Sequence, residues 1–285
     1  MKRRFLELDV FASAPGRGNP LAVVLDATGL DGATMQAIAA WLKLSETTFV
    51  LPATQPEADY RLRIFTPRQE LPFAGHPSVG TAHAALACGL ATPRDGRLVQ
   101  ECGAGLLPIR IEGDGPQRRI HVRAPRGVER ATDASAIVAS LGGVAPGSLP
   151  PAVIDNGPRW WCIELADEAA VRALAPDLDA IARANISTGT VGVAVFARCH
   201  GQPYAIVVRA FVPADGIPED PVTGSANAAI TAWLHARGAL PADRFLSSQG
   251  REVGRDGVVE CAVDDDGETW IGGQTQTVIE GALHW

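Results

Sequence analysis

Residues 63–67 read Arg63-Ile64-Phe65-Thr66-Pro67, and the pattern continues as His76-Pro77-Ser78-Val79-Gly80-Thr81-Ala82-His83-Ala84-Ala85. A second copy reads Arg209-Ala210-Phe211-Val212-Pro213 and continues as Asp220-Pro221-Val222-Thr223-Gly224-Ser225-Ala226-Asn227-Ala228-Ala229. A two-residue gap aligns the copies and places Thr81 opposite Ser225. Each copy reads as a strand, a turn, a glycine and a helix, so the sequence predicts a duplicated structural unit.

Two interpretations of the repeated Gly-Thr/Ser-Ala stay open at this point. A hydroxyl beside a helix start is ordinary capping chemistry, and alanines propagate a helix. Alternatively, two helix starts that face each other form a symmetric site for a small anion, because first-turn N–H groups attract negative charge. The matching Arg-x-Phe-x-Pro upstream favours the second interpretation, since a cap requires no such strand.

Composition excludes several classes of protein. The 285 residues suggest about two domains, and 46% hydrophobic residues are enough for ordinary cores. A net charge of −7, with 25 Lys plus Arg and no basic run, argues against nucleic acid as a partner. A small anionic substrate stays possible, because a helix start attracts anions locally. No apolar run is long enough to span a membrane, so no membrane partner is expected.

Cysteine and histidine spacing predicts neither disulfides nor a metal site. The five cysteines are scattered, odd in number and without a CxxC, which indicates reduced packing thiols in a cytoplasmic protein. The six histidines form no ligand cluster such as HExxH. The basic N-terminus leads into an alternating, acid-containing segment that reads as a strand and not as a signal peptide.

The chain alternates strands and short helices, with a boundary predicted at residues 125–127. Asp31 is the predicted cap of a helix at 33–42, and apolar spacing and stop residues predict further helices at 77–88, 134–141, 176–183 and 226–237. Strands are predicted at 5–11, 21–25, 48–51, 60–65, 98–102, 106–111, 119–122, 153–155, 160–165, 191–196, 204–211, 244–248, 258–263 and 269–279. The absence of GxGxxG after a strand disfavours a Rossmann fold. One Ala-rich helix in each half suits burial inside a curled sheet.

These features predict an α+β fold of two pseudo-symmetric domains, residues 1–126 and 127–274. Each domain is expected to be a curled, mostly antiparallel sheet around a central helix, with the active site in the cleft between the domains. The cleft would contain His76 and Asp220 at aligned positions, the backbone N–H groups after Gly75 and Gly224, and the hydroxyls of Thr81 and Ser225. Such a site would stabilise an enolate or carbanion beside a bound carboxylate.

Glu46 is the candidate base. It lies at a predicted helix-to-strand junction in Leu44-Ser45-Glu46-Thr47-Thr48-Phe49, followed by an apolar strand. A carboxylate shielded there would have a raised pKa and could both accept and return a proton. From spacing alone, an exposed Glu without a role is the commoner outcome.

Several motifs together resemble the PhzF family, the phenazine-biosynthesis-like proteins. They are Gly18-Asn19-Pro20-Leu21-Ala22-Val23, Leu44-Ser45-Glu46-Thr47-Thr48-Phe49, Phe65-Thr66-Pro67, Glu70-Leu71-Pro72-Phe73-Ala74-Gly75-His76-Pro77, Glu219-Asp220-Pro221-Val222-Thr223-Gly224-Ser225-Ala226 and Gln249-Gly250. The resemblance covers nearly the whole chain. It implies the diaminopimelate-epimerase-like fold, a final strand at about 275–285 that returns to the first domain, and a homodimer.

The resemblance also implies an activity and its residues. The family's best-characterised reaction is the isomerisation of a dihydro-hydroxyanthranilate, a biosynthetic step in which a glutamate moves a proton between ring carbons and no cofactor is needed. The matching position is Glu46. Its other polar site residues match His76, Asp220 and Ser225. We also expect a substrate contact from Asn19, and we expect Gly75 and Gly224 to shape the backbone around the anion.

Alternatives are weighed on the same residues. Related amino-acid racemases of this fold use two cysteines in the helix-start turns, and neither turn here contains one, so a two-thiol racemase is disfavoured. A serine hydrolase built on Ser225 is disfavoured because no GxSxG is present. A non-catalytic member that binds a small acid or a partner protein stays open. The sequence does not identify the substrate.

Overall fold

The computed structural model describes residues 1–285, and the chain divides into two compact units. Unit 1 consists of residues 1–123 and 272–285, and unit 2 consists of residues 124–271. The units are described in turn.

Unit 1 contains one curled sheet and two α-helices. Its elements are β1 (Lys2–Val10), β2 (Asn19–Val24), α1 (Gly32–Leu42), β3 (Glu46–Leu51), β4 (Tyr60–Phe65), β5 (Glu70–Leu71), α2 (Gly75–Ala87), β6 (Arg97–Cys102), β7 (Gly105–Glu112), a 3₁₀ turn at Gly115–Gln117, β8 (Arg119–Arg123) and β18 (Thr275–His284).

The strands of unit 1 mix parallel and antiparallel pairs. β1 pairs antiparallel with both β18 and β2, and β2 runs parallel to β3. β3 pairs antiparallel with β4, β4 runs parallel to β6, and β6, β7 and β8 form an antiparallel meander. Both parallel pairs are joined by crossovers that contain a helix, as parallel strands require.

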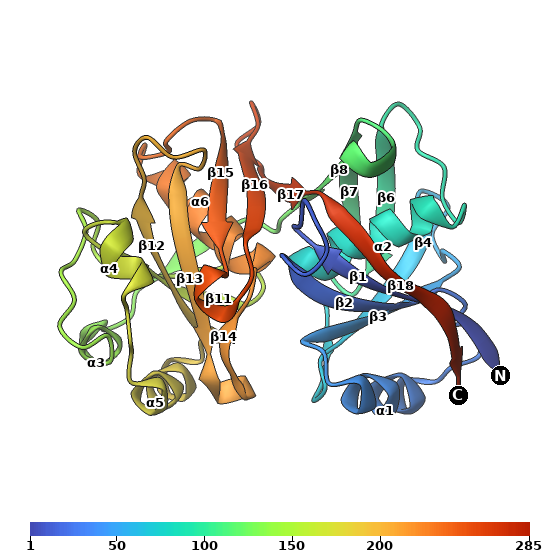
Figure 1. Ribbon diagram of the computed structural model, residues 1–285, viewed down its shortest axis with the longest axis horizontal. Helices are drawn as coiled ribbons and strands as arrows, with labels where there is room; N and C mark the ends of the chain where they lie inside the picture. Colours follow the sequence, from blue (N-terminus) through green and yellow to red (C-terminus); the bar gives the residue numbers. More distant parts are fainter. The chain divides into compact units, whose positions relative to one another are not determined.

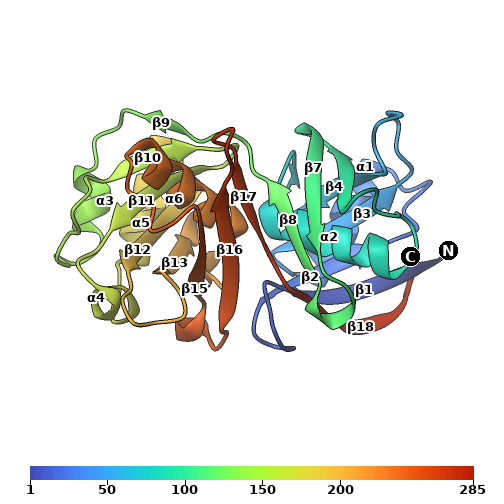
Figure 2. The same ribbon diagram turned by 90° about the horizontal axis from the view of Figure 1, so that it is seen from above.

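Helix α2 is the centre of unit 1. It contacts β1, β2, β3, β4, β8 and β18, and the ribbon views show strands on several sides of it (Figure 1 and Figure 2). Its residues are small and buried around the whole circumference, which lets strand side chains approach closely. A Cβ on Gly80 would lie 2.6 Å from Cδ2 of Leu21 and 2.7 Å from Cγ2 of Val10, so only glycine fits this contact.

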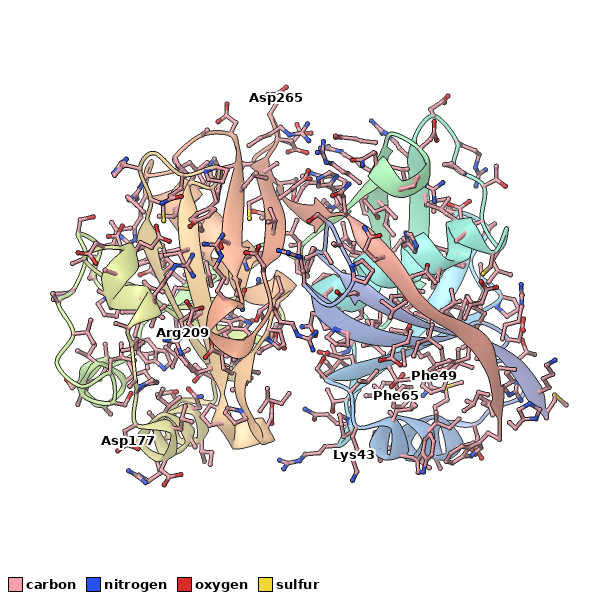
Figure 3. All side chains as sticks on the ribbon, viewed as in Figure 1. Lys43, Phe49, Phe65, Asp177, Arg209 and Asp265 are labelled. Carbon is pink, nitrogen blue, oxygen red and sulfur yellow. The ribbon has the colours of Figure 1, made fainter.

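Helix α1 covers the outer side of the unit 1 sheet. Asp31 caps its first turn by accepting a hydrogen bond from the Thr34 N–H, as the sequence predicted. Beneath it, the rings of Phe49 and Phe65 meet edge to face with centroids 5.4 Å apart (Figure 3). This packing anchors β3, the strand that begins with Glu46.

Unit 2 contains a second curled sheet and four α-helices. Its elements are β9 (Val128–Arg130), α3 (Ser135–Ala139), β10 (Ala152–Asp155), β11 (Arg159–Glu164), α4 (Glu168–Arg172), α5 (Leu178–Thr188), β12 (Gly192–Arg198), β13 (Ile206–Val212), a 3₁₀ turn at Pro213–Asp215, β14 (Ile217–Asp220), α6 (Gly224–Ala236), β15 (Arg244–Gln249), a 3₁₀ turn at Arg251–Val253, β16 (Gly257–Val263) and β17 (Thr269–Gly273).

The strand pairing of unit 2 repeats that of unit 1. β10 is antiparallel to β11, β11 parallel to β12, β12 antiparallel to β13, β13 parallel to β15, and β15 antiparallel to β16. The predicted α+β fold of two similar curled sheets, each with a central helix, is therefore confirmed. Helix α6 takes the role of α2 and contacts β10, β11 and β16.

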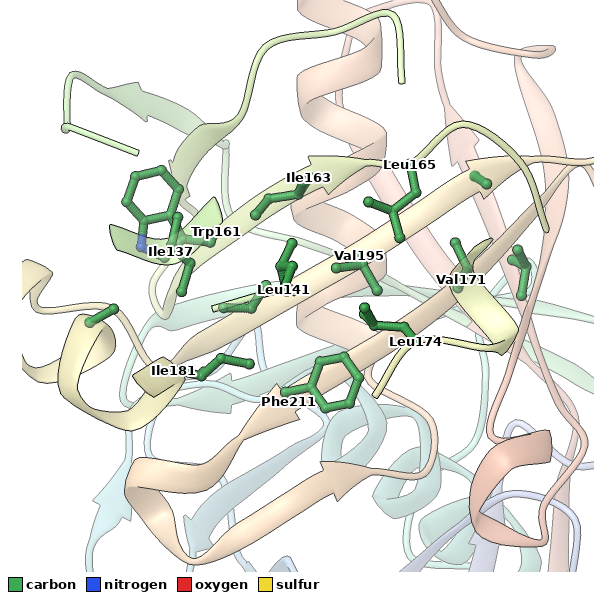
Figure 4. Packing of buried hydrophobic residues seen from close by; sticks show 14 of the residues in the cluster. Ile137, Leu141, Trp161, Ile163, Leu165, Val171, Leu174, Ile181, Val195 and Phe211 are labelled. Carbon is green, nitrogen blue, oxygen red and sulfur yellow. The ribbon is translucent and has the colours of Figure 1, made fainter. Parts of the chain in front are cut away.

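An apolar cluster fills the space between the unit 2 sheet and helices α3, α4 and α5 (Figure 4). Trp161, Val195 and Phe211 supply the sheet side, and Ile181 of α5 closes it. All four side chains are fully buried or nearly so. The other side of the sheet faces α6, which contacts β11, and the ring of Phe196 in β12 meets that of Trp233 in α6 edge to face.

The predicted register of the internal repeat was wrong. Helices α2 and α6 begin at Gly75 and Gly224, so Gly75 corresponds to Gly224 and His76 to Ser225. Thr81 is instead buried within α2, where its hydroxyl donates to Oγ1 of Thr48 at 2.9 Å. The similar Gly-Thr/Ser-Ala sequences gave the wrong alignment because the two glycines have different roles. Gly80 allows close packing inside α2, whereas Gly224 is the first residue of α6.

Other expectations also need correction. The strand predicted over residues 269–279 is two strands, β17 and β18, separated at Gln274. Gly273, with φ 154, is the last residue of β17. Helix α4 was not predicted, because its single five-residue span is too short to show apolar periodicity. No helix is long and apolar enough to cross a bilayer.

Candidate functional site

Glu46 is the first residue of β3, directly after the turn that ends α1. Lys43 is the C-cap residue of α1, and its left-handed conformation, with φ 59, makes the turn. Ser45 then donates its hydroxyl to Oδ1 of the buried Asn19, at 3.3 Å. This contact links the Glu46 turn to the start of β2, and Leu21 of β2 is the register neighbour of Glu46.

His76 lies beside Glu46. Its Nε2 is 3.4 Å from Oε2 of Glu46, and the two side chains are 5% and 16% exposed. His76 is the second residue of α2, directly after Gly75, so the central helix of unit 1 carries the imidazole to the carboxylate. The structure therefore brings Asn19, Glu46, Gly75 and His76 into one neighbourhood of unit 1.

The two central helices begin without a side-chain cap. Ala74 and Thr223 occupy the N-cap positions of α2 and α6, and neither side chain bonds to the first turn. By contrast, Asp31, Asp167 and Asp177 cap α1, α4 and α5. Uncapped first-turn N–H groups favour an anion at that end of a helix. The capping interpretation of the repeated motif is therefore wrong for both helices.

Asp220 is held by a directed chain of hydrogen bonds in unit 2. Gln249 accepts from the Thr223 N–H at 3.0 Å, which fixes the orientation of its amide. Its Nε2 donates to the Thr223 hydroxyl at 2.9 Å and to the Asp220 carbonyl at 3.0 Å. The hydroxyl, already an acceptor, donates to Oδ2 of Asp220 at 2.6 Å. Gln249 thus orients Thr223, and Thr223 orients the carboxylate of Asp220.

Ser225 lies at the second position of α6. Its Oγ accepts a hydrogen bond from the indole Nε1 of Trp160 at 3.1 Å. Its carbonyl oxygen accepts from Nδ2 of Asn156 at 2.9 Å. Asp220, Gly224 and Ser225 therefore lie in one segment of unit 2, which runs from the end of β14 into α6.

Sequence reasoning missed three residues that organise these groups. Thr223 and Trp160 were not singled out, and Gln249 was noticed only within the Gln249-Gly250 motif without a role. Gln249 is fully buried and ends β15, distant in sequence from the residues that it orients. The Gln249-Gly250 pair at the end of a predicted strand was the available signal.

The cysteines are placed as packing residues. All five are free, and Cys162 and Cys261 are buried. Burial raises the pKa of the Cys261 thiol to about 12, and burial also raises the pKa of Cys162. High pKa values disfavour the thiolate that nucleophilic chemistry needs. No group of three or more His, Cys, Asp or Glu side chains is placed to hold a metal ion.

A family model matches almost the whole chain. The family model described as phenazine biosynthesis-like protein, PhzC-PhzF, matches residues 8–281. In solved structures, the Bacillus anthracis phenazine biosynthesis protein of the PhzF family superimposes with a TM-score of 0.86, at 25% identity and with 100% of both chains covered.

Two curated relatives are similar over most of their length. The trans-2,3-dihydro-3-hydroxyanthranilate isomerase of Pseudomonas aeruginosa is 37% identical over 93% of this chain and 92% of that protein. The Schizosaccharomyces pombe protein named antisense-enhancing sequence 1 is 34% identical, with 97% of each chain covered. The fold is that of the PhzF family and related epimerase-fold proteins, and relatives named as isomerases indicate the enzyme class. The chain belongs to the PhzF family.

Proposed function

We propose that the protein is an isomerase that moves a proton on a small carboxylate-bearing substrate, with Glu46 as the single acid and base. The observation that carries the proposal is the 3.4 Å approach of Glu46 Oε2 to His76 Nε2 in a largely buried place at the start of α2. A carboxylate with an imidazole partner can receive a proton and give a proton up again.

The chemical step balances without an oxidant, a reductant or a cofactor. The Glu46 carboxylate accepts a proton from one substrate carbon, and the electron pair of the broken C–H bond passes into the conjugated system of the substrate. The carboxyl proton of Glu46 exchanges with solvent, and the protonated Glu46 then protonates a different carbon, where a new C–H bond forms. First-turn N–H groups stabilise the negative charge that develops between the two steps.

Other residues are proposed to bind the substrate or assist its reaction. We assign His76 as the partner that stabilises the Glu46 charge and Asp220 as the second catalytic polar group. Asn19, Gly75, Gly224 and Ser225 are proposed as substrate-binding positions, in support of which the helix starts at Gly75 and Gly224 lack a side-chain cap. The first compound to test is trans-2,3-dihydro-3-hydroxyanthranilate, named for the Pseudomonas relative. We also propose a homodimer in the cytoplasm, which light scattering and cell fractionation test.

The substitution Glu46→Gln tests the proposal. It keeps the shape of the side chain and removes its ability to accept a proton, so kcat is expected to fall by about 10³-fold or more. The matched control is Glu57→Gln, the same change at an exposed glutamate of unit 1. Far-UV circular dichroism verifies that both variants fold. Isomerase activity of Glu46→Gln equal to that of the control would refute the assigned base.

A second candidate function is a non-catalytic member that binds a small acid or a partner protein. The Schizosaccharomyces pombe relative favours it, since its printed name describes no isomerase and its similarity covers 97% of this chain. Binding of a carboxylate without any exchange of substrate hydrogen for solvent deuterium would support this function over the isomerase.

A further inference from the structure

The repeated fold carries a base in only one of its copies. Thr47 pairs with Phe65 between β3 and β4, and Val193 pairs with Phe211 between β12 and β13. Because Phe65 and Phe211 are the aligned phenylalanines of the repeat, the position of Glu46 in unit 1 corresponds to Gly192 in unit 2.

The neighbouring strand shows the same correspondence. Glu46 has Leu21 as its register partner in the parallel strand, and Gly192 has Trp160. The leucine position of unit 1 is therefore taken by a tryptophan in unit 2. Trp160 is 3% exposed, so the larger side chain is packed inside its unit.

The indole of Trp160 fills the space that a side chain on residue 192 would need. A Cβ on Gly192 would lie 2.6 Å from Cζ3 of Trp160 and 2.5 Å from the carbonyl oxygen of Phe211. Real Cβ atoms do not come this close to a backbone oxygen or a packed ring. A carboxylate equivalent to Glu46 is consequently excluded from the second copy.

The same indole also sets the direction of the Ser225 hydroxyl. Indole Nε1–H is a donor only, and it donates to Ser225 Oγ at 3.1 Å. With a lone pair of its oxygen occupied by this bond, Ser225 keeps its own proton for a different acceptor. Asn156 holds the backbone of Ser225 through its carbonyl at 2.9 Å, so the serine cannot easily turn away. Ser225 itself is only half-buried.

We infer that Trp160 is a positioning residue that makes Ser225 a hydrogen-bond donor to an anionic oxygen of the substrate, while it keeps the second copy of the fold free of a base. The inference rests on the proposed function, and it assigns the acceptor as a carboxylate or enolate oxygen. Unit 1 thus uses the repeated strand position for proton transfer, whereas unit 2 has Gly192 there and uses Trp160 of the neighbouring strand to orient a donor.

Binding of 3-hydroxyanthranilate, a planar carboxylate chosen as the probe, tests the inference by isothermal titration calorimetry. Trp160→Phe keeps an aromatic ring and removes the N–H, and Ser225→Ala removes the hydroxyl. Each is expected to raise the dissociation constant by about tenfold, the range for a hydrogen bond to a charged group. The double variant is expected to bind no more weakly than Ser225→Ala, because both changes remove one interaction.

Trp161→Phe is the matched control. Trp161 is the next residue of β11, fully buried, and its Nε1 also donates to a hydroxyl, that of Thr188 at 3.3 Å. Its variant is expected to lose stability and to bind the probe like the wild type. The inference is overturned if Trp160→Phe binds the probe as tightly as the wild type, or if Trp161→Phe weakens binding as much as Trp160→Phe does. It is also overturned if the double variant loses the sum of the two single-variant binding energies, or if the wild type does not bind the probe.

Two further measurements keep the outcome unambiguous. Should Trp160→Phe fail to fold, the indole N–H resonance of Trp160 is followed in ¹⁵N-labelled protein. It is expected to shift in Ser225→Ala and on addition of the probe, and an unchanged resonance in both cases refutes the inference. Glu46→Gln is expected to bind the probe and to lack activity. If it stays active, the proposed base is wrong while the Trp160 result stands on its own.

Discussion

Nε2 of His76 lies 3.4 Å from Oε2 of Glu46, and these atoms come from the start of the central helix and the start of a neighbouring strand. Both side chains are mostly buried, so their charges interact more strongly than on a surface. An imidazole that carries its proton on Nε2 stabilises the ionised carboxylate of Glu46 at this distance. It therefore suits a base that must return its proton.

Replacement of His76 by Asn is expected to lower kcat by about 10- to 100-fold with a smaller effect on KM, because Glu46 loses the imidazole beside it. His200→Asn is the control, since His200 is exposed. Steady-state kinetics on both variants measures the difference. An unchanged kcat for His76→Asn would show that the imidazole has no part in the proton transfer.

Gln249→Glu is expected to reduce kcat/KM by about tenfold or more. The introduced oxygen cannot donate to the Thr223 hydroxyl, so that hydroxyl loses the bond that directs its proton to Asp220. Gln202→Glu, the same change at an exposed glutamine of unit 2, serves as the control. Equal kcat/KM values in the two variants would mean that the orientation of Asp220 does not matter for activity.

The repeated arginines have a structural role that the sequence did not reveal. Arg209, labelled in Figure 3, bonds with two nitrogens to the carboxylate of Glu219, at 2.9 and 2.7 Å, and its guanidinium lies over the Phe211 ring. It also donates to the carbonyl oxygen of Leu174, at 2.6 Å. In unit 1, Arg63 pairs in the same way with Glu70, at 2.7 Å for both bonds.

The two pairs differ in burial, and this predicts different stability losses. The Arg209 and Glu219 side chains are each 9% exposed, so Arg209→Ala is expected to lower the free energy of unfolding by about 3–5 kcal/mol. Arg63 and Glu70 are 29% and 43% exposed, so Arg63→Ala is expected to cost about 1 kcal/mol or less. Urea unfolding measures both. A larger loss in Arg63→Ala than in Arg209→Ala would contradict this account.

The lowered pKa of His83 in α2 predicts that the protein loses stability in acid. Burial, together with the nearby charge of Arg118, lowers the pKa of its imidazole from 6.5 to about 4. Between these values the unfolded chain binds a proton that the folded chain does not, so the free energy of unfolding decreases as the pH falls from 6.5 toward 4.

His83→Gln should remove this part of the pH dependence. Between pH 7 and pH 5, the wild type is expected to lose about 1–2 kcal/mol more than the variant, after allowance for the partial exposure of the ring. Urea unfolding at several pH values compares them. Parallel stability curves for the two proteins would show that His83 titrates alike in the folded and unfolded chains.

The sequence predicted the fold well where local chemistry is strong. The Asp31 cap, the apolar face of α1 and the strand at residues 60–65 appear as expected. The Arg-x-Phe repeat correctly indicated two similar units. Its register failed beyond the strand, because similar letters at Gly80 and Gly224 serve different purposes, close packing in one helix and the start of the other.

The candidate site was predicted by resemblance more than by residue pattern. A lone glutamate such as Glu46 has no local signal, and its partner His76 follows a different strand and turn. Gln249 and Trp160 act through contacts between residues distant in the chain, which periodicity and spacing do not reveal. The absence of a carboxylate at Gly192 became visible only through the strand register.

Solvent deuterium uptake tests the central claim, proton transfer by Glu46, most directly. The wild type and Glu46→Gln are incubated with trans-2,3-dihydro-3-hydroxyanthranilate in D₂O, and deuterium in the carbon skeleton is measured by NMR. We expect the wild type to introduce deuterium at the carbon that receives the proton and Glu46→Gln to introduce none above the uncatalysed rate. Equal deuterium uptake by the two folded proteins would contradict the assignment of Glu46 as the base.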